Sequence, residues 1–417
     1  MKYITEALKT PIADEVDVLV LGSGPAGVSA AVAAARQGVR VMIVEQGGAV
    51  GGIATSGLMS HWAGTADSGI YREILKKSSE GELTITIDPE RLKTVLLNML
   101  HDAGVIIRLY TFACGALKDG NRVSGVVLES KSGREAVLSK VVIDATGDGD
   151  IAAKAGVPYR KGRETDGKMQ PATMMFKVGG VDCDHAVFLS SVESTYETEK
   201  GELQALARKH IPAPAGHVLL YRTTVPGVVT CNMTNCTGVD GTSAADLTHA
   251  EFVCRNQLDA IVKFLREYVS GYEKCFVISS SSLMGIRETR HFEGEYTITE
   301  NDILESRVFD DWAVRNASFN FDVHNIDGSG LDKNGVQKHF PKISGYTIPY
   351  RCFVPKEIDG LLLSGRNISG THIAHSNFRV MPICAAIGEA GGIAAAIAVK
   401  NNINVREVKA ADIQKHF

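Results

Sequence analysis

The 417-residue chain lacks CxxC pairs, an apolar leader and an excess of either charge. Its eight cysteines show no spacing typical of iron–sulfur clusters or zinc fingers, so we expect no metal site. There are 44 lysines and arginines against 48 aspartates and glutamates, and the net charge of −4 gives no reason to expect nucleic acid as a partner. The start, MKYITEALKT, has no hydrophobic signal segment, so we expect a cytoplasmic protein with reduced thiols.

Long hydrophobic runs are also scarce. The most membrane-like stretch, residues 382–399, is rich in Ala and Gly, contains Glu389 and barely reaches the length of a bilayer span. We expect a buried helix there and no stable membrane insertion. Glycine, in contrast, is abundant, with 42 of 417 residues against a usual fraction of ~7%. Because no Gly-X-Y period accompanies them, these glycines indicate tight turns and close approaches of the backbone to a ligand.

The clearest pattern is a βαβ unit between residues 16 and 46. VDVLVLG is typical of a parallel strand buried on both faces, and the turn GSGPAG, a small-residue helix and a second strand, VRVMIVEQ, follow it. Gly22, Gly24 and Gly27 form a GxGxxG pattern, and Glu45 ends the second strand 18 residues after Gly27. In this context the pattern predicts dinucleotide binding.

Each residue of the pattern has a distinct physical task. Gly22 permits the tight turn, Gly24 lets the backbone approach a pyrophosphate, and Gly27 lets the helix pack on the sheet. The start of the helix then presents free N–H groups and a positive dipole end to the phosphates. Glu45 is expected to accept hydrogen bonds from the adenosine ribose, and its charge disfavours the 2′-phosphate of NADP. The alternative is a tight turn that binds no ligand.

The rest of the chain returns to the same pattern only at its end. VVIDATGDGD (141–150) and GLLLSGRN (360–367) each indicate a strand that stops in a glycine turn. Between them, alternating runs and the amphipathic helix HAEFVCRNQLDAIVKFLREYV change the character of the chain. We therefore predict an α/β fold with a parallel central sheet. A Rossmann-like dinucleotide-binding domain would comprise 1–154 and 351–417, and a mixed α/β substrate domain would be inserted at 155–350.

Four segments resemble the FAD-dependent oxidoreductase family, within the glutathione-reductase-like flavoproteins that have two dinucleotide-binding domains. They are EQGGAVGGIATSGL (45–58), GIRETRHFEGEYTIT (285–299), IPYRCFVPKEIDGLLLSGRNIS (348–369) and THIAHSNFRVMPICAAIGEAGG (371–392). The resemblance extends along the chain and is weakest between 180 and 280. It implies FAD as the cofactor.

The resemblance also implies which residues contact FAD. The expected contacts are Gly22, Gly24, Ala26, Gly27, Glu45, Gly52, Ala145, Thr146, Gly147, Gly365 and Arg366, with the backbone near Ala113 beside the adenine. The helix that begins at Met381, Pro382 and Ile383 is expected to direct its N–H groups at the flavin C2 carbonyl, where negative charge builds when a hydride reaches N5. Alternatively, Pro382 only starts a core helix.

Candidate catalytic residues are those that the resemblance brings near the flavin ring. These are His61, His372, Arg287 and Arg379, and His375 and Arg290 lie close to them in the sequence. An arginine could bind a carboxylate or polarise a carbonyl, and a histidine could take the proton lost from C–OH during hydride transfer. The alternatives are that Arg287 and Arg290 pair with Glu288 and that the histidines are ordinary hydrogen-bonded groups.

Two further pairs receive a structural interpretation. Asp322 and His324 in FNFDVHN share one face of an extended segment. We expect them to stabilise the following NIDGSG turn, although a role in the site is the alternative. Cys231 and Cys236 are five residues apart without a CxxC, so we do not expect a redox-active disulfide.

The sequence therefore predicts an FAD-dependent oxidoreductase that transfers a hydride between flavin N5 and a small polar organic substrate. Because the chain has one convincing GxGxxG, electrons would leave to oxygen, a quinone or a partner protein. Three alternatives stay open: a fumarate-reductase-like reductase of an activated C=C bond, an NAD-dependent dehydrogenase, and a non-catalytic dinucleotide-binding protein.

Overall fold

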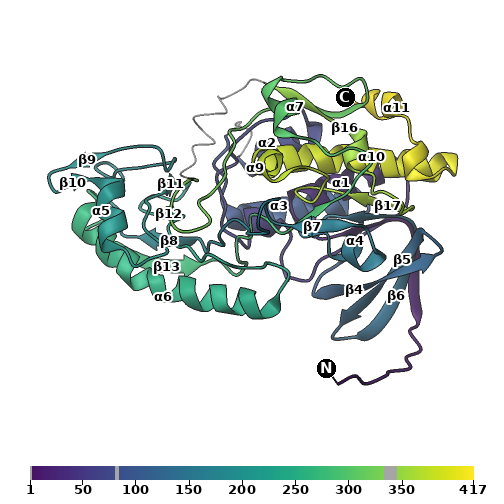
Figure 1. Ribbon diagram of the computed structural model, residues 1–417, viewed down its shortest axis with the longest axis horizontal. Helices are drawn as coiled ribbons and strands as arrows, with labels where there is room; N and C mark the ends of the chain where they lie inside the picture. Colours follow the sequence, from purple (N-terminus) through teal and green to yellow (C-terminus); the bar gives the residue numbers. More distant parts are fainter. Residues whose placement is uncertain (1, 80–83, 333–344) are drawn as a thin grey trace.

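The computed structural model describes residues 2–79, 84–332 and 345–417. Its central element is a seven-stranded sheet (Figure 1). Five strands run parallel: β1 (Ile12–Leu21), β2 (Val41–Val44), β3 (Ile106–Arg108), β6 (Gly133–Asp144) and β17 (Leu361–Leu363). Two antiparallel strands, β4 (Thr111–Asp119) and β5 (Arg122–Ser130), extend the sheet beyond β6. The apolar β1 and β2 lie inside the sheet, as the sequence predicts for strands covered on both faces.

Strand β6 pairs with β1 along one edge and divides its other edge between two neighbours. Its first half pairs antiparallel with β5, where Gly133 faces Ser130, and its last residues pair parallel with β17, where Val142 faces Leu361. The segment from residue 360 therefore returns to the sheet that the first 150 residues build. The prediction of an α/β fold with a Rossmann-like parallel sheet that is discontinuous in sequence is confirmed.

Two helices that are far apart in sequence pack closely beside this sheet. They are α1 (Pro25–Arg36) and α10 (Met381–Asn401), seen together in Figure 1. A Cβ atom at Gly388 or Gly392 would overlap the backbone carbonyl of Ala26 or Ala30, so only glycine allows this approach. Among the described helices, α10 alone is long and apolar enough to cross a membrane, but 83% of its apolar window is buried inside the molecule. The predicted buried helix is confirmed.

A second, smaller core lies at the opposite end of the molecule from β4 and β5 (Figure 1). Its antiparallel sheet has the order β11 (Leu220–Arg222), β12 (Val229–Cys231), β8 (Phe176–Gly179) and β13 (Phe276–Ser280). The long helix α6 (Ala244–Tyr268) and the short α5 (Leu203–His210) complete it. The buried side chains of Phe176, Leu220, Phe264 and Tyr272 form this core without contribution from the large sheet.

The chain between β6 and β17 rejoins the large core before residue 350. Phe292, Phe321 and Tyr346 are buried in the core of the large sheet. They belong to or lie near β14 (Arg290–Phe292), which pairs with β7 (Tyr159–Lys161), and β15 (Trp312–Ala317), which pairs with β16 (Tyr346–Pro349). The inserted domain at 155–350 stays a prediction, and the buried side chains place its last part with the large core.

The remaining elements are short or peripheral. They are α2 (Gly69–Ser78), α3 (Pro89–Asp102), α4 (Asp150–Ala155), β9 (Glu197–Thr198), β10 (Gly201–Glu202), α7 (Glu300–Leu304), α9 (His372–Phe378) and α11 (Ala410–Gln414). Of these, α9 matters most for the site, because it leads directly into α10.

Candidate active site

A large cavity of about 970 Å³ lies at the carboxyl ends of the parallel strands. Its walls include residues that directly follow β1, β2, β6 and β17, the edge at which open α/β sheets bind their ligands. Of the predicted cofactor residues, it is lined by Gly22, Gly24, Ala26, Glu45, Gly52, Ala113, Ala145, Thr146, Gly147, Gly365, Arg366 and Met381. The cavity is not lined by the remaining three, Gly27, Pro382 and Ile383, which are buried.

The glycine turn is tight at two positions and open at the third. Gly22 has a φ of +85°, and a Cβ there would lie 2.5 Å from the carbonyl oxygen of Ala145. At Gly27 a Cβ would overlap the carbonyl of Gly22. Gly24, the N-cap of α1, has no protein atom within 4 Å of such a Cβ. The turn therefore leaves free space at the residue where a pyrophosphate needs it, and the cavity fits a dinucleotide.

Glu45 is held in a fixed orientation at the cavity wall. One carboxylate oxygen accepts hydrogen bonds from the backbone N–H of Ser23 at 2.9 Å and from the Ser23 hydroxyl at 2.7 Å. The other oxygen accepts one from the backbone N–H of Gly47 at 2.7 Å. These bonds join the ends of β1 and β2, so the carboxylate stays beside the space that the turn leaves open.

A buried carboxylate that the sequence analysis missed holds the loop after β6. Asp144 accepts hydrogen bonds from the Thr146 hydroxyl at 2.7 Å and from the backbone N–H groups of Ile151 and Ala152 at 2.9 and 2.8 Å. Burial raises the pKa of Asp144, although these hydrogen bonds oppose the shift. Its signal was its place as the last residue of an apolar strand before the ATG turn.

A smaller cavity of about 310 Å³ adjoins the large one. Five residues line both: Ile53, Ile286, Arg366, Arg379 and Met381. The smaller cavity lies between the large sheet and the second core, which contributes Leu219, Tyr221 and Asn232. Three of the predicted catalytic residues, His61, Arg287 and Arg379, line it.

Arg287 stands at this cavity without a carboxylate partner among the described residues. Its guanidinium donates hydrogen bonds to the Pro171 carbonyl at 2.6 Å and to the Thr173 hydroxyl at 2.7 Å. Burial, together with the charge of Arg379, lowers the pKa of Arg287 to about 10. Pairing with Glu288, the alternative interpretation of the sequence, is wrong for this residue.

Arg290 does not pair with Glu288 either. Its guanidinium binds the Asp150 carboxylate at 2.9 Å and the Asp148 carbonyl at 2.7 Å, and so connects β14 to the start of α4. This arginine lines the large cavity. The alternative interpretation, in which Arg290 pairs with Glu288, is therefore also wrong.

Asp322 and His324 line the smaller cavity, and the expectation that they stabilise the following turn is wrong. Asp322 accepts a hydrogen bond of 2.7 Å from Arg379 and lies 3.3 Å from His324 Nε2. Burial alone would raise the pKa of Asp322, but His324, Arg379 and Arg287 hold it well below its usual range. Burial and Arg287 lower the pKa of His324 to about 4. The tertiary fold brings these groups to the cavity, and their spacing in the sequence does not predict it.

His61 and Tyr221 also line the smaller cavity. Their rings stack with centroids 5.5 Å apart and planes within 9°. Burial lowers the pKa of His61 and raises the pKa of Tyr221 to about 12. At neutral pH the histidine is therefore a proton acceptor, and the phenol is a proton donor.

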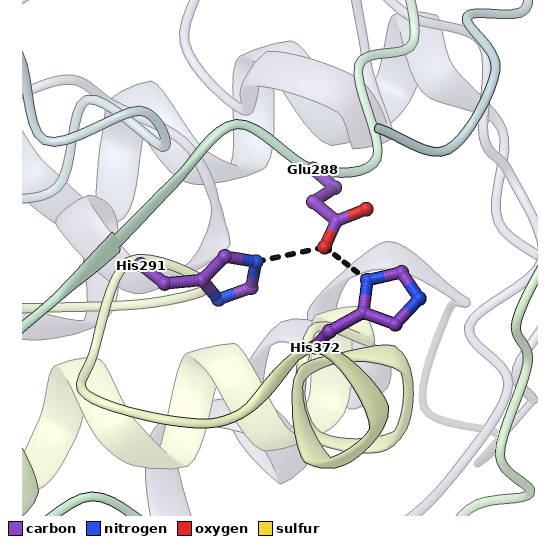
Figure 2. Close-up of side chains that lie close together, drawn as sticks. All are labelled: Glu288, His291 and His372. Atoms are coloured by element: carbon purple, nitrogen blue, oxygen red, sulfur yellow. Dashed lines mark hydrogen bonds and ion pairs between the residues drawn. The ribbon is translucent and has the colours of Figure 1, made fainter. Parts of the chain in front are cut away.

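His372, also predicted to be catalytic, lines neither cavity. It binds the buried carboxylate of Glu288, which also binds His291 (Figure 2). His375 is buried behind the cavity walls and also lines neither cavity. A catalytic role for His372 stays a prediction, and its contacts connect it to Glu288.

The family described as FAD dependent oxidoreductase matches residues 17–417. The chain belongs to this family. FAD is its cofactor, and the predictions of a flavoprotein oxidoreductase and of FAD are confirmed. The resemblance noted in the sequence thus extends over nearly the whole chain.

Curated relatives match parts of the chain. Digeranylgeranylglycerophospholipid reductase 1 of Methanococcoides burtonii is 26% identical over 42% of this chain and 47% of its own length. Digeranylgeranylglycerophospholipid reductase 1 of Methanopyrus kandleri is 32% identical over 34% of this chain and 43% of its own length. The chain thus spans less than half the length of these relatives in the matched regions.

Among solved structures, the flavin-dependent brominase Bmp2 superposes with a TM-score of 0.52 at 14% identity. The match covers 96% of this chain and 82% of the brominase. At this identity the likeness shows a shared fold and nothing about substrate.

Proposed function

We propose that this chain transfers a hydride between FAD and a small carboxylate-bearing organic substrate that binds in the smaller cavity. The observation that carries the proposal is Arg287, a guanidinium at the cavity wall that has no carboxylate partner among the described residues. An unpaired buried cation costs free energy, and a bound carboxylate would offset that cost through charge-assisted hydrogen bonds.

The large cavity would hold FAD with its pyrophosphate over Gly24 and its adenosine beside Glu45 and Ala113. The residues that line both cavities, among them Arg379 and Met381, would then lie beside the isoalloxazine ring. When bound there, FAD supplies a two-electron acceptor or donor at N5. The start of α10 would direct its positive dipole end toward the ring.

The protein groups of the smaller cavity would bind the substrate and move its proton. Arg287 would hold the carboxylate, and Arg379, fixed by Asp322, would orient the carbon that reacts. His61, whose pKa burial lowers, is neutral near pH 7 and would accept the proton that leaves a C–OH group as the hydride leaves carbon. The substrate would thus lose two electrons and two hydrogens in total.

A second candidate is the reduction of an activated C=C bond, and Tyr221 favours it. Because burial raises the pKa of Tyr221 to about 12, the phenol stays protonated and could donate a proton to the carbon next to the one that receives the hydride. The matched relatives are named as reductases of a digeranylgeranyl phospholipid. A 310 Å³ cavity walled by arginines and histidines suits a small acid better than such a chain.

Anaerobic titration of the purified FAD-loaded protein tests both candidates. Oxidised protein is mixed with a panel of small hydroxy and amino acids, and dithionite-reduced protein with a panel of unsaturated acids. Bleaching of the flavin by a saturated acid supports the first candidate, and reoxidation by an unsaturated acid supports the second. Reaction only with uncharged compounds would overturn the carboxylate proposal.

The matched variants are Arg287→Ala and Arg315→Ala. Arg315 lies on β15 with its side chain 45% exposed, beside Asp67, and lines neither cavity. Arg287→Ala should keep FAD but lose the shift of the flavin spectrum that inert carboxylates such as acetate or succinate cause, whereas Arg315→Ala should retain it. An unchanged shift in Arg287→Ala would remove Arg287 from the substrate site.

A further inference from the structure

Three buried side chains from two distant segments meet beside the active site. Glu288 and His291 come from the segment that leads into β14, and His372 is the first residue of α9 (Figure 2). Their side chains are 0%, 2% and 5% exposed. One ligand atom of each lies within 4.8 Å of the other two. None of the three lines either cavity, so the proposed reaction does not use them.

Both ring nitrogens of His291 face oxygen atoms that can only accept a hydrogen bond. Its Nδ1 lies 3.2 Å from the carbonyl oxygen of Gly370, which can only accept. Its Nε2 lies 2.7 Å from Glu288 Oε1, which as a carboxylate oxygen also only accepts. A neutral imidazole has one N–H group. With that proton on Nδ1, the Nε2 lone pair points at a carboxylate, so either a second proton or a metal ion must lie between them.

His372 directs a second nitrogen at the same place. Its Nδ1 lies 2.5 Å from the same oxygen of Glu288. The other Glu288 oxygen accepts the backbone N–H of Gln170 at 3.0 Å, which fixes the carboxylate with Oε1 toward both histidines. Metal-binding histidines usually donate their other N–H group to a carbonyl or carboxylate, and metal-binding carboxylates are usually held by a hydrogen bond of their own. His291 and Glu288 have such partners in Gly370 and Gln170.

We propose that Glu288, His291 and His372 bind one divalent transition-metal ion, for which Zn²⁺ is the fitting cation. Two imidazole nitrogens and one carboxylate oxygen are a ligand set that zinc uses, at metal–ligand distances of about 2.0–2.2 Å. In a tetrahedral site with bonds of about 2.1 Å, neighbouring ligand atoms lie about 3.4 Å apart. Each imidazole nitrogen would therefore move away from Glu288 Oε1 by somewhat less than about 1 Å from its present 2.7 or 2.5 Å. The inference goes beyond the proposed redox function and does not depend on it.

A fourth nitrogen is close by. His375 lies three residues after His372 on α9, so both side chains project from one side of the helix. Its ring stands edge-on to that of His291 with centroids 5.1 Å apart, and its buried Nδ1 has no hydrogen-bond partner among the described atoms. His375 is thus a neighbour of the cluster, although it is not one of the three residues whose ligand atoms lie within 4.8 Å of one another.

The ion would fix two parts of the active site relative to each other. Glu288 directly follows Arg287, the proposed carboxylate-binding residue, and α9 leads through Arg379 into α10. A metal bound by ligands from both segments would connect the substrate-binding arginine to the helix that faces the flavin. Its role is structural, since the cluster is closed to both cavities.

The test uses full-length FAD-loaded protein that is treated with a chelator, incubated with Zn²⁺ and passed over a desalting column. Elemental mass spectrometry should find one zinc ion per chain. The melting temperature of the zinc-loaded protein should be higher than that of the chelator-treated protein. Glu288→Gln, His291→Gln and His372→Gln should each lose the ion and the rise. His101→Gln, which changes a histidine 85% exposed, should keep both.

X-ray absorption of the zinc-loaded wild type keeps the test decisive if the variants fail to fold. The proposal expects only nitrogen and oxygen neighbours, with imidazole scattering. Zinc bound through sulfur would assign the ion to cysteines and overturn the proposal. Absence of stoichiometric zinc in the wild type, or unchanged zinc in all three variants, would show that protons alone hold this cluster together.

Discussion

The guanidinium of Arg379 donates a hydrogen bond of 2.7 Å to Asp322 Oδ2 and another of 2.8 Å to the Asp322 carbonyl. These two contacts join the C-cap of α9 to a segment that also lines the smaller cavity. Arg379 is thereby neutralised and fixed in place, whereas Arg287 in the same cavity donates hydrogen bonds to a carbonyl and a hydroxyl and none to a carboxylate among the described residues. We therefore propose different tasks for the two arginines, positioning for Arg379 and anion binding for Arg287.

A double-mutant cycle should measure a strong coupling between Asp322 and Arg379. Asp322→Asn leaves a largely buried guanidinium without its carboxylate, and the expected loss of unfolding free energy is about 3 kcal/mol. The double variant Asp322→Asn/Arg379→Gln should lose less than the sum of the single changes. Urea unfolding of the four proteins gives the coupling free energy.

The exposed pair Arg36 and Glu73 is the matched control for that cycle. It is equally short, at 2.7 Å, but its side chains are 46% and 25% exposed. Solvent screening should hold its coupling below about 1 kcal/mol. Equal coupling in the two pairs would contradict the view that burial makes the Asp322–Arg379 contact strong.

Gly24→Val should give a folded but colourless protein. A side chain there meets no protein atom and has an allowed backbone, with φ of −64°, but it fills the space over the start of α1. The ratio of flavin absorbance to protein absorbance measures the loss, and far-ultraviolet circular dichroism confirms the fold. Gly27→Val, which would overlap the Gly22 carbonyl, should disrupt the fold itself. Full FAD occupancy in Gly24→Val would contradict the placement of the pyrophosphate.

Neighbouring glycines on α10 should respond oppositely to alanine. Gly392→Ala forces a methyl group into the Ala30 carbonyl and should cost about 3 kcal/mol of unfolding free energy. At Gly391 the nearest atom, Ser364 Oγ, would lie 3.9 Å from the new Cβ. Gly391→Ala should therefore be neutral or stabilise by up to about 1 kcal/mol, because alanine restricts the unfolded chain. Thermal unfolding of the two variants measures this difference. Equal changes in stability for Gly392→Ala and Gly391→Ala would contradict the close packing of α1 and α10.

Stability should decrease in acid because His217 is buried as a neutral group. Burial lowers its pKa from 6.5 to about 3 in the folded protein. Between these values the unfolded state binds more protons, so the free energy of unfolding falls as the pH drops from about 6.5 toward 3. The contribution of His217 is present above pH 6.5 and is lost below it.

Urea unfolding at several pH values tests this dependence. His217→Gln cannot take up a proton, and its stability should fall less steeply between pH 6 and 4 than that of the wild type. His249→Gln, a change at an exposed histidine of α6, is the control and should follow the wild type. Parallel curves for His217→Gln and the wild type would show that His217 does not titrate with folding.

The sequence alone determined the features that depend on neighbours along the chain. Strand, glycine turn, helix and Glu45 lie within 30 residues, and the geometry that places Gly24 over open space follows from φ and packing inside that unit. The long buried helix at 381–401 could be predicted for the same reason, because its small-residue composition is local.

Only the tertiary structure decided which side chains share a cavity. The sequence predicts a turn role for Asp322, because its partner, Arg379, is 57 residues away. The alternative that pairs Glu288 with the arginines beside it fails because its partners are histidines, one of them 84 residues later. The reason is physical: a charged group binds what the packing of the two cores brings near it. Distance along the chain does not encode that arrangement, whereas a turn or a helix is settled by the residues next to it.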